Sequence, residues 1–187
     1  YQTITNIIGK LQPTIRSIRY ANKLLPTHIL RDIYFTHIYP HLISNISIWG
    51  TPDHKKTYIQ PLIRTQKMII RLIKNLPPRT HTRPLMTELR ILNIISLYIL
   101  RVATETHPFI HLPRRLNRPE HNHNYLTTAH IHDYPTRHSQ QRHLYIPNTY
   151  HVHTATNAKH TIDYTTERNT RVWNSVPPEI RQITNLK

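Results

Sequence analysis

Apolar residues recur every three to four positions over the first hundred residues, which is the spacing of one face of an α-helix. This spacing predicts a helix over residues 3–25. Gly9 and Pro13 predict a break within it, because proline cannot continue the helical hydrogen-bond ladder. A second helix is expected to start at Pro26-Thr27, with Thr27 as its cap, and to end at Pro40.

Further segments continue this pattern as far as Thr106. Residues 42–49 alternate enough for a strand but also fit a helix, which we favour, and residues 50–53 are expected to form a turn. A helix is expected from about residue 54 to residue 75, where two prolines follow, and another from about residue 85 to residue 104.

Beyond Thr106 the pattern collapses. Residues 107–150 are rich in Pro, His, Asn, Arg and Thr and keep no sustained period, which is typical of a poorly ordered linker. Pro177 and Pro178 suit the first turn of a short final helix. Short β-like stretches are expected around residues 143–146, 150–155 and 160–165.

These patterns predict a mainly α protein, in which a helical bundle precedes an irregular, partly disordered segment with minor β structure and a short terminal helix. The expected division is a helical domain over residues 1–106, a low-order linker over 107–150 and a small C-terminal module over 151–187. Hydrophobic residues make up 37% of the chain, a low share for a core of full size. The apolar stretches are too interrupted to span a membrane. Because the chain begins at Tyr1, we expect it to be a piece of a longer protein.

The charge is strongly unbalanced. The chain holds 25 Lys and Arg against 9 Asp and Glu, a formal net charge of +16. Such a field attracts polyanions, among which nucleic acid is the commonest partner. An anionic membrane is the alternative, but membrane binding needs a basic helix with bulky apolar anchors on the opposite face. The charge therefore predicts a nucleic-acid partner and no membrane partner.

The helix expected over residues 54–75 carries the most specific feature. Four basic residues are spaced by three, four and three positions, which places them along one helical face: Arg64, Lys67, Arg71 and Lys74. Four isoleucines run along a neighbouring face that can pack inward: Ile59, Ile63, Ile70 and Ile73. A helix with these two faces can lie along a duplex and contact successive phosphates without reading base sequence. The alternative is a solvated basic face.

No residue set predicts catalysis in this chain. Polymerases hold metal ions on paired carboxylates, whereas the four aspartates are isolated: Asp32, Asp53, Asp133 and Asp163. Ser139 and Ser175 lack the glycine-rich turn of a nucleophilic serine. We therefore predict no catalytic residue and no cofactor here.

The 16 histidines suggest metal binding, because pairs one residue apart occur at residues 121 and 123, 130 and 132, and 151 and 153. A structural zinc site needs four ligands at defined spacing, usually including cysteine, and the chain has no cysteine. The scarcity of residues with G-starting codons indicates a nucleotide bias that also enriches histidine. We predict no metal site. Trp49 and Trp173 each lie among aliphatic residues and close a turn, so we expect both to be core anchors.

Several segments together carry a family resemblance. Residues 171–180 (RVWNSVPPEI) are similar to the end of the reverse transcriptases of non-LTR (LINE-type) retrotransposons, in particular the Jockey-like group. Other segments earlier in the chain are also similar to this family and occur in the same order as in its members: 23–26 (KLLP), 33–42 (IYFTHIYPHL), 46–50 (ISIWG), 66–75 (QKMIIRLIKN), 81–85 (HTRPL), 89–94 (LRILNI), 132–139 (HDYPTRHS) and 146–147 (IP).

The resemblance implies that the helical domain is a thumb-like bundle of an RNA-directed DNA polymerase that copies element RNA at a nicked chromosomal target. The full enzyme would use Mg²⁺, which this part does not hold. The implied partners are the RNA template, the DNA primer, their hybrid duplex, and the palm and fingers of the same polyprotein. The implied location is the nucleus, with the element ribonucleoprotein also in the cytoplasm.

The chain departs from the family where glycines are common, since Ser44-Asn45 and Asn157 or Asn169 stand near those places. Asparagine tolerates a positive φ better than most residues, so a turn there can survive. The departure equally fits a degenerate element copy. The alternatives are a free-standing basic RNA- or DNA-binding protein, including a domesticated remnant, and a structural protein of a large ribonucleoprotein.

Overall fold

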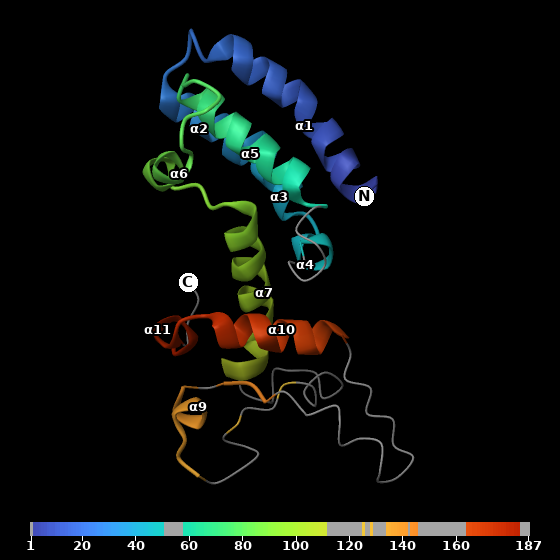
Figure 1. Ribbon diagram of the computed structural model, residues 1–187, viewed down its shortest axis with the longest axis vertical. Coiled ribbons are helices and arrows are strands. Elements are labelled where there is room, and N and C mark those ends of the chain that lie inside the picture. Colours follow the sequence, from blue (N-terminus) through green and yellow to red (C-terminus); the bar gives the residue numbers. More distant parts are fainter. Residues whose placement is uncertain are drawn as a thin grey trace. The chain divides into compact units, whose positions relative to one another are not determined.

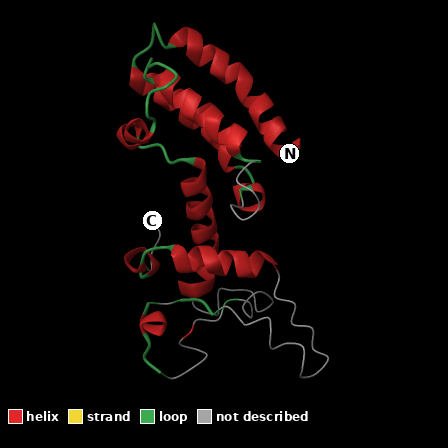
Figure 2. Ribbon diagram, viewed as in Figure 1, coloured by secondary structure: helices red, strands yellow, loops and turns green. Residues whose placement is uncertain are grey.

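A computed structural model describes residues 2–50, 58–111, 134–141, 143–145 and 164–183, together with Tyr125 and Thr128. The chain divides into two compact units, unit 1 (Tyr1–Arg101) and unit 2 (Val102–Lys187). The prediction of a mainly α fold is confirmed, and in the described parts of the chain there are helices and loops but no strand (Figure 2). The three predicted domain ranges remain a prediction.

Unit 1 is a bundle of helices in which α1 and α5 lie side by side (Figure 1). One turn of the bundle, η1, is a π-helix and joins α2 to α3. The elements of unit 1 are α1 (Gln2–Ala21), α2 (Thr27–Ile33), η1 (Tyr34–Ile38), α3 (Tyr39–Ile43), α4 (Ile46–Trp49), α5 (Gln60–Ile73) and α6 (Arg83–Leu89). Helix α7 (Ile94–His111) begins in unit 1 and continues into unit 2. No helix among the described residues is long and apolar enough to cross a membrane.

Helix α1 is continuous, so the predicted break at Gly9 and Pro13 is wrong. One face of α1 is almost completely buried, at Ile4, Leu11, Ile15 and Ile18. Burial of four large aliphatic side chains stabilises a fold by about 1.5–3 kcal/mol each. That gain outweighs the roughly 3 kcal/mol cost of an internal proline.

The second helical segment also differs from the prediction. Helix α2 begins at Thr27, its cap position is Pro26, and no side-chain hydrogen bond caps it. The helical path does not end at Pro40 either, because Pro40 lies in the first turn of α3. An amide in the first turn of a helix has no intrahelical acceptor, so proline is tolerated there. The π-helical turn η1 directly precedes this helix.

Residues 42–49 are helical, as predicted, apart from a turn between α3 and α4. Asn45 at this turn has φ 53°, in the left-handed region. Asn45 therefore adopts the positive φ that asparagine tolerates better than most residues. Asn169 lies inside a helix without a positive φ, and Asn157 lies outside the described residues.

The single helix predicted over residues 85–104 is two helices, α6 and α7. Arg90 has φ 54°, and the Ile91 amide donates to the Met86 carbonyl at 2.8 Å. This is the hydrogen bond of a left-handed helix C-cap, and it turns the chain away from the α6 axis. The predicted helix over residues 54–75 corresponds to α5, which begins at Gln60 and ends at Ile73, and residues 58–59 form a turn instead of helix. Residues 51–57 lie outside the described residues.

Unit 2 contains the second half of α7, α9 (Arg137–Gln140), α10 (Tyr164–Ser175) and α11 (Pro178–Arg181). The final short helix was predicted, and Pro178 stands in its first turn. Residues 107–111, at the start of the predicted linker range, belong to α7. Of the predicted β stretches, residues 143–145 contain an isolated β-bridge at Leu144 but no strand, and residues 164–165 are helical. The other positions lie outside the described residues.

The packing of unit 2 explains why α7 continues past Thr106. The His107 and His111 rings stack at 4.4 Å between centroids, and both lie near Trp173. Their Nε2 atoms are 2.7 Å from the Ile183 carbonyl oxygen and 2.8 Å from the Arg181 carbonyl oxygen. These contacts join the C-terminal segment to α7, and they have no local sequence signature.

Candidate nucleic-acid interface

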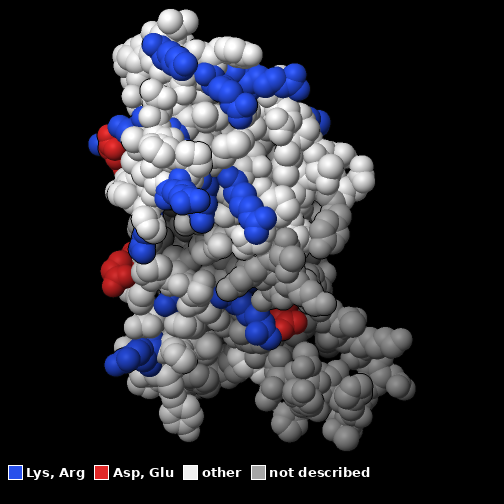
Figure 3. Space-filling model, turned by 45° about the horizontal axis from the view of Figure 1, so that its top comes forward, with Lys and Arg blue, Asp and Glu red and all other residues white. Residues whose placement is uncertain are grey.

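The positive charge is concentrated in unit 1. Residues 1–101 hold 15 Lys and Arg against three Asp and Glu, whereas residues 102–187 hold 10 against six. Figure 3 shows Lys and Arg in several patches on one face of the molecule, with few acidic side chains between them. The field around unit 1 would therefore attract a polyanion more strongly than the field around unit 2.

Helix α5 presents the four predicted basic residues to different environments. Arg64 and Lys67 are exposed on the helix surface. Arg71 is half-buried, and its Nε donates to the Thr80 carbonyl oxygen at 2.8 Å. Lys74 follows the last helical residue and lies beyond the regular helix. Of the four predicted basic residues, Arg64 and Lys67 are therefore the two that are exposed to solvent.

Lys74 is engaged by an acid from another helix. Its Nζ lies 2.7 Å from Oε1 of Glu88 on α6, and the Lys74 side chain is 23% exposed. An ion pair of this kind reduces the positive charge that Lys74 offers to a phosphate. Sequence spacing along α5 could not show this pair, because Glu88 comes 14 residues later.

The inward face of α5 holds the helix in the bundle. Ile59, Ile70 and Ile73 are buried, as predicted, and Leu62 and Ile69 are buried with them. Ile63, predicted for the same face, is half-buried at the edge of a groove. The basic and apolar faces of α5 therefore lie on different sides of the helix.

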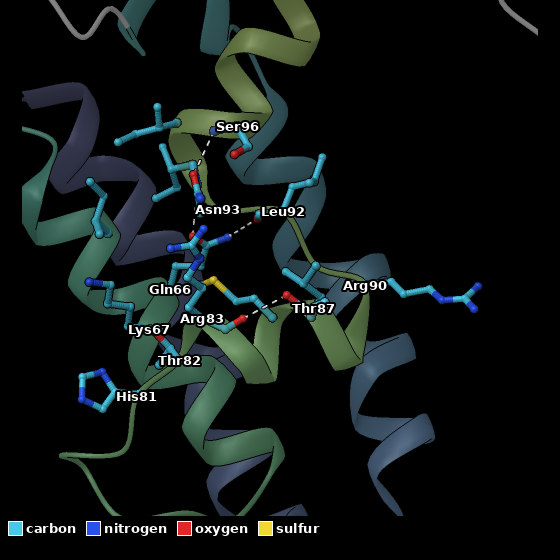
Figure 4. A pocket seen from close by; sticks show the side chains of 15 residues that line it. Gln66, Lys67, His81, Thr82, Arg83, Thr87, Arg90, Leu92, Asn93 and Ser96 are labelled. Atoms are coloured by element: carbon cyan, nitrogen blue, oxygen red, sulfur yellow. Dashed lines mark hydrogen bonds between the residues drawn. The ribbon is translucent and has the colours of Figure 1, made fainter. Parts of the chain in front are cut away.

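A groove of about 810 Å³ runs beside α5, between this helix, α6 and the start of α7. Lys67 lines it from α5, and Arg83 from the first turn of α6 (Figure 4). Arg90 contributes to the lining by its position, but its side chain extends away from the other labelled residues (Figure 4). Lys67 thus belongs both to the α5 surface and to the groove.

The groove depends on Gln66, a buried residue whose structural role the sequence analysis missed. Gln66 is 1% exposed. Its Nε2 donates to the Tyr34 hydroxyl at 3.0 Å and to the Leu92 carbonyl at 2.9 Å. Its Oε1 accepts from the Ile94 amide at 3.2 Å. One amide therefore joins η1, α5 and the α6–α7 turn. The available signal was an amide on the apolar side of an amphipathic helix.

Burial also determines the protonation state of Tyr34, whose hydroxyl accepts a hydrogen bond from Gln66. Desolvation raises the pKa of Tyr34 to about 12, with the hydrogen bond from Gln66 acting in the opposite direction. Tyr34 therefore keeps its proton at neutral pH, and the Gln66 contact is a bond between neutral groups.

The two tryptophans predicted as anchors are both buried. Trp49 is 9% exposed, and its Nε1 donates to the Ser44 carbonyl at 2.7 Å. Its carbonyl accepts a hydrogen bond from the Tyr58 hydroxyl. Trp173 is 2% exposed and lies beside the two stacked histidines of α7.

Most of the aspartates and histidines that were considered for catalysis or metal binding lie outside the described residues. Of the four aspartates, only Asp32 is described, and it is exposed on α2. The three predicted histidine pairs are not among the described residues. In the described part of the chain, no group of three or more His, Asp or Glu side chains could hold a metal ion.

Comparison of the chain with protein-family models, curated proteins and solved structures gave no match. The resemblance to non-LTR reverse transcriptases therefore rests on the residue patterns alone.

In unit 2, the basic groups affect one another. The pKa of His143 is lowered to about 4, first by burial and then by the charges of Arg181 and His138. Arg181 is 2% exposed, and burial lowers its pKa as well. His143 is therefore neutral at pH 7.

This shift predicts that acid destabilises unit 2. A histidine in the unfolded chain titrates near pH 6.5, so the unfolded state binds more protons between pH 6.5 and about 4. The contribution of His143 to stability is fully present above this window and is lost as the pH falls through it. Urea unfolding at several pH values should show a shallower pH dependence for H143Q than for the parent. Equal dependence in both proteins would contradict the prediction.

Proposed function

We propose that unit 1 binds a nucleic-acid duplex through its phosphates, and that the chain is the C-terminal, duplex-gripping part of a LINE-type reverse transcriptase. The observation that carries the binding proposal is the exposed pair Arg64 and Lys67 on α5, beside a groove that Arg83 lines from the other side. Within residues 1–101 only three acidic residues oppose this charge.

The proposed mode of binding follows from the geometry of α5. Arg64 and Lys67 are three residues apart, about 4.5 Å along the helix axis. Two cations at this separation can contact neighbouring phosphates of one strand. Arg83 reaches the same partner from across the groove. Contacts of this kind position a duplex and carry no base information.

The assignment to a reverse transcriptase is supported by positions that both carry the resemblance and have a structural role in unit 1. Gly50 follows Trp49 in the ISIWG segment and packs against Ile46 and Tyr98. Gln66 opens the QKMIIRLIKN segment and joins three parts of the bundle. In this proposal the partners are RNA template, DNA primer and their hybrid, and catalysis belongs to a palm with paired aspartates. A reading frame that encodes such a palm upstream of Tyr1 would support this part.

The binding proposal is tested by the salt dependence of binding to a short RNA–DNA hybrid. Each phosphate neutralised contributes about 0.9 to the slope of log K against log salt concentration for B-form DNA, and a hybrid is expected to behave similarly. R64A/K67A should therefore flatten the slope by about 2 units. The helix should remain folded, because both residues are exposed and alanine is the best helix former.

Two further variants make the test specific. R137A/R171A removes the same formal charge from exposed positions of unit 2, where Glu167 engages Arg171 at 2.7 Å, and should change the slope by less than half as much. E88Q removes the acid that engages Lys74 and should strengthen binding. If the two double variants lose the same affinity, the positive charge acts diffusely and the α5 interface is wrong.

A further inference from the structure

A second basic surface lies at the end of α1, where one aromatic and one aliphatic side chain are almost fully exposed. Tyr20 is 79% exposed and Leu24 is 84% exposed. Three exposed cations surround them in the sequence: Arg16, Arg19 and Lys23. We call these five residues the Tyr20 surface. It shares no residue with the α5 interface.

The helical geometry of α1 places Arg16, Arg19 and Tyr20 close together on its exposed side, and Lys23 and Leu24 follow in the turn after the helix. Within the helix, Arg16 and Tyr20 are four residues apart and Arg16 and Arg19 are three apart, which are the intervals of neighbouring side chains on a helix surface. The chain contains no acidic residue before Asp32, so nothing in the local sequence neutralises these cations. The apolar face of α1 is buried in the bundle and does not contribute to the surface.

The Tyr20 surface adjoins the end of α5. Asn22 donates from Nδ2 to the Leu72 carbonyl at 3.3 Å and lies 3.5 Å from Oδ1 of Asn75. The C-terminal ends of α1 and α5 therefore meet inside unit 1.

We propose that the Tyr20 surface is a second nucleic-acid site, which binds an unpaired strand by stacking a base on the Tyr20 ring while Arg16, Arg19 and Lys23 hold the phosphates. Every nucleobase has an apolar π-face, so a tyrosine ring binds unpaired bases without sequence preference. In a duplex these faces are covered by neighbouring base pairs. The ring therefore distinguishes single strands from duplexes, which the cations alone cannot do.

An unpaired strand fits the surface better than an anionic membrane. A membrane-binding helix inserts a broad apolar face opposite its basic residues. In α1 that face is buried in the bundle, at Ile4, Leu11, Ile15 and Ile18. Only Tyr20 and Leu24 remain outside, and both lie among the cations instead of opposite them.

The test measures binding of the full chain to a short oligothymidylate, a matching oligouridylate and a duplex by fluorescence anisotropy. Loss of the stacking of one base should make Y20A bind a single strand about 5- to 150-fold more weakly than the parent. Y20F keeps the ring and should stay within about twofold of the parent. Duplex binding should be unchanged in Y20A, and so should the salt slope, because no charge is removed.

An abasic strand provides the matching control on the ligand. Without bases there is nothing to stack, so the parent and Y20A should bind it equally weakly. Equal single-strand affinity of the parent and Y20A would overturn the proposal, as would an equal loss in Y20F. Loss of binding only to anionic vesicles in Y20A would identify a membrane as the occupant. Failure of the α5 interface appears separately, in the duplex arm with R64A/K67A.

Discussion

Replacement of Gln66 with Met is expected to lower the free energy of unfolding by about 2–5 kcal/mol. Methionine has a similar volume and keeps the packing, but it cannot replace the bonds that Gln66 makes to the Leu92 carbonyl and the Ile94 amide. A buried backbone group without a partner costs about 1–3 kcal/mol. Chemical unfolding followed by circular dichroism measures the difference.

Y34F is the matched control for this prediction. It removes only the hydroxyl that accepts the third Gln66 bond, so its cost should be smaller, about 1 kcal/mol. In the double variant the two losses should not add, because the hydroxyl contact is already absent in Q66M. If Q66M unfolds within 0.5 kcal/mol of the parent, a threshold of roughly the size of a neutral surface change, Gln66 does not hold the bundle together.

The second large effect is expected for G50A. A Cβ atom at Gly50 would lie 2.5 Å from the Ile46 carbonyl oxygen and 2.9 Å from Cδ2 of Tyr98. The carbonyl belongs to the preceding helical turn and cannot move without distorting α4. Overpacking of this kind costs about 1–3 kcal/mol. The backbone itself permits alanine, because φ at Gly50 is −80°.

The other glycine of the chain provides the control with the opposite sign. A Cβ atom at Gly9 would have nothing within 4 Å, and Gly9 lies within α1. G9A should therefore raise stability by about 0.5–1 kcal/mol, because alanine loses less backbone entropy in a helix. Thermal unfolding of both variants measures the pair. A stabilising G50A would show that α4 is not packed as described.

The candidate interface could be predicted only in part from the sequence. Spacing placed Arg64, Lys67, Arg71 and Lys74 on one face, because a helix repeats every 3.6 residues wherever it lies. Whether each cation is available depends on groups far along the chain. Glu88 engages Lys74, and the Thr80 carbonyl engages Arg71. The salt-dependence test therefore uses Arg64 and Lys67.

Breaks between helices were the least predictable part of the fold. Pro13 predicted a break that burial of the α1 face overrides. Conversely, the apolar spacing of residues 85–104 continues through the turn that starts at Arg90. Leu92 in that turn is 46% exposed, although its apolar character fits the helical pattern. Local propensities of about 1–3 kcal/mol cannot decide such cases when burial contributes as much or more.

The sequence by itself determined the mainly α character of the chain, the excess of positive charge and the two-faced character of α5. These properties depend on residue type and local spacing, which are already present in the unfolded chain. Only the tertiary structure decided where the charge is available, which helix continues past a proline, and that Gln66 joins η1 to α5 and the α6–α7 turn. These outcomes depend on side chains and backbone groups that are distant in sequence and meet only when apolar faces are buried together.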